Sequence, residues 1–163
     1  MRLVPILLLA LALAPARAGA QAERAEVSVG LQQDTSLPVE VTSQELSVDQ
    51  SKGVAIFTGN VLVVQGEMKL TAPRLEVTYS QGEAGRIERV HATGGVTLVN
   101  PREAAEAEEA VYTVGSGSIV MTGEVLLTQG QTTLAGTRLT IDLETGSGQM
   151  QGPVRTLFQT DGE

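Results

Sequence analysis

Residues 54–79 read VAIFTGNVLVVQGEMKLTAPRLEVTY, and this stretch decides the fold because the chain contains a second version of it. A shift of 64 positions aligns it with residues 118–143, SIVMTGEVLLTQGQTTLAGTRLTIDL, and nine of the aligned residues are identical. The identical positions include the Thr-Gly pair at 58–59 and the Gln-Gly pair at 65–66. The chain is therefore built on an internal repeat.

A shorter unit lies inside this repeat. It recurs four times with a period of 29 residues, and the second copy holds six additional residues near 81–86. A period of this length is typical of stacked supersecondary units, none of which can bury its apolar face alone. Each unit has an apolar leading residue (Leu46, Leu75, Ala110, Leu139), a glycine (Gly59, Gly94, Gly123, Gly152) and a valine two positions after the glycine (Val61, Val96, Val125, Val154).

Alternation of polar and apolar residues predicts β-strands across almost all of residues 39–158. β-Branched residues are dense, and turn signals such as Gln81-Gly82 and Gly115-Ser116-Gly117 recur along the chain. Residues 103–110 are rich in Ala and Glu and would favour a helix by propensity alone, but they align with the strand predicted at 68–75. We therefore predict strand there too, and an all-β fold.

The alternation also predicts an interior face, because successive side chains of a strand lie on opposite faces. The face that holds Phe57 and Val61 stays aliphatic in later units, whereas the face that holds Leu62 becomes polar at His91 and Thr97. The aliphatic face is therefore the interior. With so few aromatic residues, this interior suits either a dry packed core or a cavity for a flexible apolar ligand. The glycine column is expected to form bulges or close backbone contacts.

The first 20 residues predict a cleaved secretory signal. Arg2 is followed by an apolar run at 3–14 and a small-residue site at 18–20, and this run is too short to cross a bilayer. We expect export to a bacterial periplasm. The expected organisation is a signal peptide at 1–20, a flexible N-terminal segment at 21–37, one β domain at 38–158 and a short tail at 159–163.

Composition excludes several classes of partner and site. Removal of Arg2 and Arg17 with the signal leaves 9 basic against 19 acidic residues, a charge that disfavours nucleic acid and anionic membrane surfaces. The chain has no cysteine and one histidine, His91, which excludes a His/Cys metal cluster. We predict no metal and no cofactor.

Nothing in the sequence predicts an active site, so we expect no enzyme. The serines of Gly115-Ser116-Gly117-Ser118 read as a turn, since the helix that follows a nucleophile elbow is lacking. The acidic residues Glu103, Glu106, Glu108 and Glu109 could hold calcium, but alternate positions on a strand favour a solvated face. Arg74 and Arg138 occupy the same position of the repeat. Two explanations stay open: they bind the phosphates of an anionic lipid, or the repeat geometry alone places them there.

A further set of motifs comprises Phe57-Thr58-Gly59-Asn60-Val61, Gln65-Gly66, Lys69, Ala72-x-x-Leu75-x-Val77 and a second copy at Met121-Thr122-Gly123-Glu124-Val125. These motifs resemble the OstA-like family of lipopolysaccharide transport, and the resemblance covers residues 39–152. It implies a V-shaped antiparallel β jelly roll that is open at both ends and whose lumen accepts the acyl chains of lipid A. It also implies head-to-tail assembly between an inner-membrane-anchored partner and an outer-membrane complex.

The resemblance also implies which residues line the lumen. Those expected to contact lipid are Val39, Val41, Leu46, Val48, Phe57, Val61, Val63, Leu75, Val77, Val96, Leu98, Met121, Val125, Leu127, Leu139 and Ile141.

The two ends of the stack are expected to mediate assembly. The first strand, at 39–48, and the last, at 150–158, have no further neighbour in the chain, and unpaired strand edges invite another chain. Because the two ends differ, joining them is head-to-tail. The expected assembly-edge residues are Val154, Leu157 and Phe158. The alternative to a transport protein is a structural β-repeat protein with a closed dry core and no lipid ligand.

Overall fold

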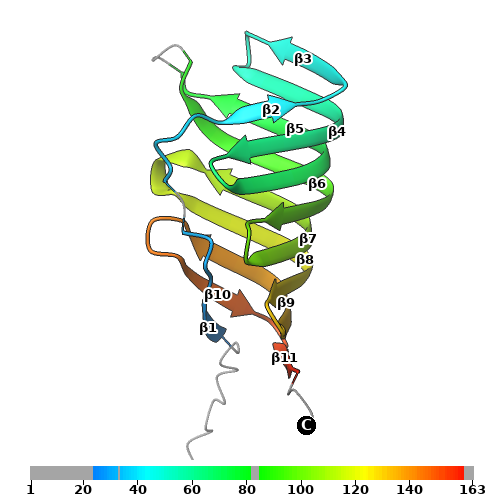
Figure 1. Cartoon of the computed structure of the whole chain (residues 1–163). Helices are drawn as coiled ribbons and strands as arrows, with labels where there is room; N and C mark the ends of the chain where they lie inside the picture. Colours follow the sequence, from blue (N-terminus) through cyan, green and yellow to red (C-terminus); the bar gives the residue numbers. More distant parts are fainter. Residues whose placement is uncertain (1–23, 33, 82–84, 160–163) are drawn as a thin grey trace, which may run out of the picture.

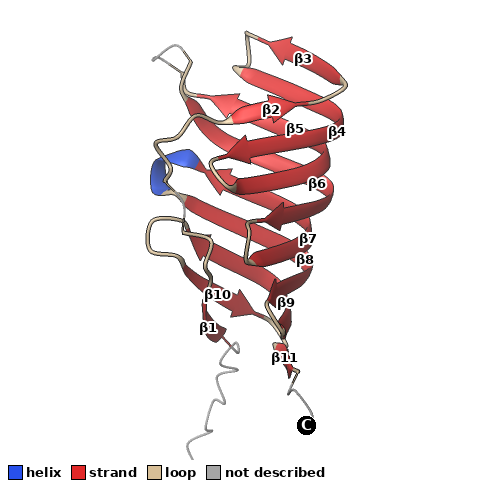
Figure 2. Cartoon of the chain, viewed as in Figure 1, coloured by secondary structure: helices blue, strands red, loops and turns tan. Residues whose placement is uncertain are grey.

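The computed structural model describes residues 24–32, 34–81 and 85–159, so the predicted signal peptide lies outside the described part. These residues form one antiparallel sheet of eleven strands with a single short 3-10 turn, η1 (Val114–Ser116) (Figures 1 and 2). The all-β prediction is confirmed. The strands are β1 (Arg24–Ser28), β2 (Glu40–Thr42), β3 (Glu45–Asp49), β4 (Val54–Gln65), β5 (Met68–Tyr79), β6 (Ile87–Val99), β7 (Glu103–Thr113), β8 (Ser118–Gln129), β9 (Thr132–Asp142), β10 (Ser147–Gln151) and β11 (Arg155–Phe158).

The strands are stacked almost in chain order. The sheet runs β1-β10-β9-β8-β7-β6-β5-β4-β2, with β3 also paired to β4 and β11 also paired to β9. Hairpins therefore make up the middle of the stack. The Ala- and Glu-rich strand β7 pairs with both β6 and β8, as the alignment of residues 103–110 predicted.

Each long strand is divided by a bulge into two parts that belong to two facing walls (Figure 1). The register shifts between Thr58 and Val61 in β4 and between Thr122 and Val125 in β8. We call the wall that contains residues 61–72, 96–107 and 125–136 wall A, and the wall that contains 54–58, 74–93, 109–122 and 138–151 wall B. Side chains of both walls join a single apolar cluster between them.

The glycines predicted as a column lie at these bulges. Gly59 and Gly123 have φ of 80° and 81°, a backbone conformation that disfavours a side chain. A Cβ atom on Gly123 would lie 2.8 Å from the Cβ of Glu108, and one on Gly59 would lie 2.9 Å from the Cβ of Gln44. The bend therefore requires both a positive φ and the absence of a side chain.

Gly59→Val and Gly123→Val should each lower the melting temperature of the ligand-free protein. A branched residue at positive φ costs about 1–3 kcal/mol before the clash with the neighbouring strand is added. The matched control is Gly115→Val, because Gly115 has an ordinary φ and a Cβ there would meet nothing within 4 Å. Thermal unfolding followed by circular dichroism measures the difference. Equal melting temperatures in all three variants would contradict the structural role of the glycines.

The predicted flexible segment at 21–37 is wrong for its central part. Strand β1 pairs with β10 along its whole length, and Val29 and Leu31 are each only 1% exposed. β10 consequently has strand partners on both sides, so the prediction that residues 150–151 form an unpaired edge is also wrong. The edges of the stack are β2 with β3 at one end and β1 with β11 at the other (Figure 1).

Candidate functional site

The interior between the two walls is the candidate site, and the predicted inward face does point into it. Along β8, Met121 and Leu127 are fully buried while Thr122, Leu126 and Thr128 on the other face are partly exposed. Of the predicted lumen residues, the buried ones are Val61, Leu75, Val77, Val96, Leu98, Met121, Val125, Leu127, Leu139 and Ile141.

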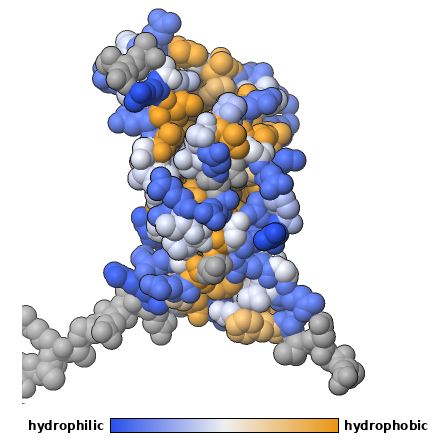
Figure 3. Space-filling view, turned by 60° about the vertical axis from the view of Figure 1, so that its left-hand side comes forward, coloured by the Kyte–Doolittle hydropathy of each residue, from blue (hydrophilic) through white to orange (hydrophobic). Residues whose placement is uncertain are grey.

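The remaining predicted lumen residues lie towards one end of the stack. Val39, Val41, Phe57 and Val63 are partly buried, and Leu46 and Val48 on β3 are 56% and 58% exposed. At the opposite end, the predicted edge residues Leu157 and Phe158 on β11 are 59% and 68% exposed, and Val154 is partly buried. Figure 3 shows apolar surface at both ends of the molecule. The aliphatic interior thus reaches the surface at each end.

The middle of the interior is packed and apolar. Leu75, Leu98 and Leu127 have no exposed surface, and in the part of the chain that the structure describes the buried side chains that carry polar groups are Gln65 and Tyr112. Such an environment offers mainly hydrocarbon contact. What it can do chemically is hold an apolar ligand by removing it from water.

A segment that was not predicted covers the open side of the V. Between β1 and β2 the chain runs along the seam where the hairpin turns of walls A and B face each other (Figure 1). We call its described residues, 29–32 and 34–37, the strap. Val29 and Leu31 of the strap belong to the same apolar cluster as the interior residues.

The strap is hydrogen-bonded to both walls. On wall B, the Val29 N–H donates to the Gly146 carbonyl at 3.1 Å and the Gln32 side chain donates to the Glu144 carbonyl at 2.8 Å. On the wall A side, the Gly30 N–H donates to Glu103 Oε1 at 2.6 Å.

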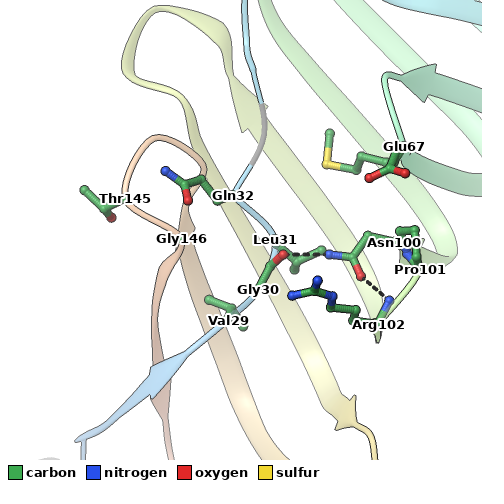
Figure 4. Close-up of a pocket in the computed structure, with 11 residues that line it drawn as sticks. Val29, Gly30, Leu31, Gln32, Glu67, Asn100, Pro101, Arg102, Thr145 and Gly146 are labelled. Atoms are coloured by element: carbon green, nitrogen blue, oxygen red, sulfur yellow. Dashed lines mark hydrogen bonds between the residues drawn. The ribbon is translucent and has the colours of Figure 1, made fainter.

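The turn between β6 and β7 adds a second contact from wall A. Asn100 Nδ2 donates to the Gly30 carbonyl at 2.9 Å, and Asn100 Oδ1 accepts the Arg102 N–H at 2.8 Å (Figure 4). A polar cavity of about 540 Å³ lies beside these groups, lined by strap residues 29–32, by residues 100–102 and by the Thr145-Gly146 turn. Asn100 and the strap thus form one side of a polar recess at the seam.

Further along the chain the strap is held by wall A and by its own turn. Gln65 Nε2 donates to the carbonyls of Thr35 and Leu37 at 3.2 and 2.9 Å. The N–H and hydroxyl of Ser36 donate to Asp34 Oδ1 at 2.9 and 2.5 Å, and these bonds lower the pKa of Asp34. The strap therefore crosses from wall B near β1 to wall A near β2.

The charged residues considered as sites are mostly on the outer surface. His91 and Glu109 form a pair at 3.1 Å, and Arg74 pairs with Glu76 at 3.0 Å. In the described part of the chain no group of three His, Cys, Asp or Glu residues is placed to hold a metal. Ser116 lies in η1 with its hydroxyl bonded to the Thr113 carbonyl at 3.4 Å, which is a turn.

Glu103 departs from the predicted solvated face. Glu106, Glu108 and Glu109 are exposed as expected, but Glu103 is partly buried and also accepts a bond from Gln129 Nε2 at 2.8 Å. Its role is to join the strap to the turn ends of wall A.

No helix among the described residues has the length and apolar character to span a membrane.

Comparison with known proteins places the fold among lipopolysaccharide transport components. Residues 40–147 match the family described as LptA/(LptD N-terminal domain) LPS transport protein. An uncharacterised protein of Rhizobium meliloti is 30% identical over 138 residues, which is 80% of this chain and 74% of that protein. The lipopolysaccharide export system protein LptA of Escherichia coli is 30% identical over 113 residues, and the match spans 66% of this chain and 60% of LptA.

The fold is also that of a solved structure. LptH, the LptA-homologous periplasmic component of the lipopolysaccharide transport device of Pseudomonas aeruginosa, superposes with a TM-score of 0.69 at 18% identity. The match covers 78% of this chain and 99% of LptH. The predicted β jelly roll is confirmed by this similarity and by the unclosed antiparallel sheet.

Proposed function

Because this chain belongs to the LptA/(LptD N-terminal domain) family of lipopolysaccharide transport proteins, we propose that it binds lipopolysaccharide in the periplasm and passes it towards the outer membrane. The observation that supports the proposal best is the continuous aliphatic interior, which reaches the surface at both ends of an unclosed sheet. Export through the signal at residues 1–20 is part of the same proposal.

Binding follows from the chemistry of the interior. Removing an acyl chain from water contributes about 0.8 kcal/mol per methylene, so a chain of ten methylenes gains on the order of 8 kcal/mol. The polysaccharide gains nothing there and stays in water. The proposed acyl-chain contacts are the predicted lumen residues, with Phe57, Val63, Leu46 and Val48 at one mouth.

Transfer requires that the ligand not return to water at each step. A stack of similar aliphatic layers lets an acyl chain move between environments of nearly equal free energy. We propose that copies of the chain join head-to-tail through the β2–β3 edge and the β1–β11 edge, which makes the interior continuous across molecules. The remaining proposed partners are an inner-membrane-anchored protein at one end and an outer-membrane assembly protein at the other.

Native mass spectrometry tests the function directly. Protein stripped of lipid and then mixed with lipopolysaccharide should give a complex whose added mass includes lipid A. The matched control is the polysaccharide released from the same lipopolysaccharide, which lacks acyl chains and should not bind. If the folded protein captures neither ligand, the structural β-repeat protein with a closed dry core is the better description.

A further inference from the structure

At the seam between the two walls, the apolar interior is covered by a separate segment and not by the sheet. In Figure 1 the strap runs past the ends of the hairpins, from β1 at the bottom to β2 near the top. Its position matters for the proposed ligand, because lipopolysaccharide couples acyl chains that must be inside to a large polysaccharide that must stay outside.

The middle of the interior is filled by aliphatic side chains. Leu98, Met121 and Leu139 are fully buried, and Val29 and Leu31 of the strap belong to the same apolar cluster. An acyl chain that occupies this space must therefore separate the walls or replace the strap side chains. Replacing Val29 and Leu31 exchanges one buried aliphatic surface for another. Spreading the walls, in contrast, exposes the aliphatic surfaces of both walls to water.

A covered seam also blocks the exit of the headgroup. A lipid whose acyl chains lie in the interior between the two ends of the stack has its sugar at the seam, because the sheet covers the interior on its lateral sides. While the strap bridges the walls, the sugar cannot move along the seam without crossing residues 29–32 or 34–37. Lipopolysaccharide therefore cannot move along the stack while the strap is closed.

On the basis of the proposed function, we propose that the strap is a lateral gate for lipopolysaccharide, opened by release of Gly30 from wall A. The lower end of the strap continues from β1, which is paired to β10 on wall B, and its upper end leads into β2 on wall A. In the lower part of the seam, the hydrogen bonds that join the strap to wall A within the described residues come from Glu103 and Asn100. Breaking them opens a slot between the strap and the β6–β7 turn.

The contact at Glu103 is built to be reversible. Glu103 Oε1 accepts two bonds, from the Gly30 N–H and from Gln129, but Oε2 is buried without a partner among the described residues. A buried carboxylate oxygen without a donor regains a hydrogen bond to water when the strap leaves, which offsets part of the bond that is lost. Asn100 and Gly30 border the polar cavity, so water has access to both.

A cysteine pair tests the gate, since the chain has no cysteine of its own. In Gly30→Cys/Glu103→Cys a new Cβ at position 30 would lie where the Glu103 side chain now ends, 3.3 Å from its Cδ, and Gly30 has no positive φ that would disfavour a side chain. The oxidised protein has a covalently closed strap, and the same protein after reduction has lost the Glu103 contact. Fluorescently labelled lipopolysaccharide should be captured by the reduced form and almost not at all by the oxidised form.

A second variant makes the test independent of disulfide formation. Glu103→Ala should raise the rate of capture roughly tenfold, because a hydrogen bond to a charged group corresponds to a factor of at least that order. Glu106→Ala is the matched control, an exposed glutamate on the same strand that should leave the rate unchanged. Circular dichroism checks that every form is folded.

The outcomes separate the gate from the function. Equal capture by oxidised and reduced protein, or equal rates for Glu103→Ala and Glu106→Ala, would overturn the gate and leave lipopolysaccharide binding intact. No capture by the unmodified protein would overturn the proposed function and the gate with it. Slow capture confined to the oxidised form would support the gate.

Discussion

Leu127→Asp should abolish capture of lipopolysaccharide. Leu127 is fully buried in the middle of the interior, where an acyl chain would lie against it. An aspartate there places an ionised group among aliphatic side chains, and without a partner it costs several kcal/mol to keep from water. Capture of the labelled lipid, measured by fluorescence anisotropy, should fall below detection.

The neighbouring residue supplies the control. Leu126 is also a leucine on β8, but its side chain points out of the interior and is partly exposed, so Leu126→Asp should change capture by less than about twofold. Leu127→Asp will also lower the stability of the fold, which by itself reduces capture. Phe57→Asp is therefore a second variant on the interior face that should stay folded. Phe57 is only partly buried near one mouth, so the charge there can reach water while it still repels acyl chains. Equal loss of capture in folded Phe57→Asp and Leu126→Asp proteins would show that the interior face is misassigned.

The faces of the strands were predictable because they depend only on local alternation. In β8 each residue from Ile119 to Thr122 alternates between buried and partly exposed, which is the period of two in the sequence. The same logic placed β7 correctly, since the alignment of repeats is a stronger constraint than the helix propensity of its Ala and Glu residues. The bulges were predictable from the glycine column, because Gly59 and Gly123 have a positive φ there, a conformation that favours glycine.

The strap was not predicted, because its structure depends on contacts far away in the sequence. The N–H groups of Val29 and Gly30 donate hydrogen bonds to Gly146 and Glu103, which lie more than 70 positions away. The sequence from Gln32 to Ser36 is polar and suggests a linker. One signal was present and overlooked. Val27, Val29 and Leu31 alternate with polar or small residues, as a strand does, and all three are packed against the apolar cluster.

The ends of the stack were predicted only in part for a similar reason. The sequence shows where the repeat stops, but not that β10, near its end, pairs with the N-terminal strand β1. Leu157 and Phe158 nevertheless remain exposed on β11, and Leu46 and Val48 remain exposed on β3. Apolar side chains at both ends, beside free strand edges, are what an end-to-end contact needs.

Charges at either end should therefore prevent self-association. The tail variant is Leu157→Asp/Phe158→Asp and the head variant is Leu46→Asp/Val48→Asp. Each pair of carboxylates would be buried without partners in the contact, which should weaken association about a hundredfold or more. Sedimentation velocity over a range of concentrations should show each variant as a monomer under conditions where the unmodified chain forms larger species. The tail variant should still capture lipopolysaccharide, because its substitutions lie outside the packed middle of the interior.

Mixing the two variants distinguishes head-to-tail assembly from a symmetric dimer. In a head-to-tail chain, the intact head of the tail variant can bind the intact tail of the head variant, so the mixture should form one contact and stop at a dimer. A symmetric dimer made by two heads would behave differently: the tail variant alone would still dimerise, and mixing would add nothing. A mixture that remains monomeric would contradict assembly through these edges altogether. Recovery of a dimer, and of nothing longer, is the result expected if two unlike ends of this sheet meet to extend the interior from one molecule to the next.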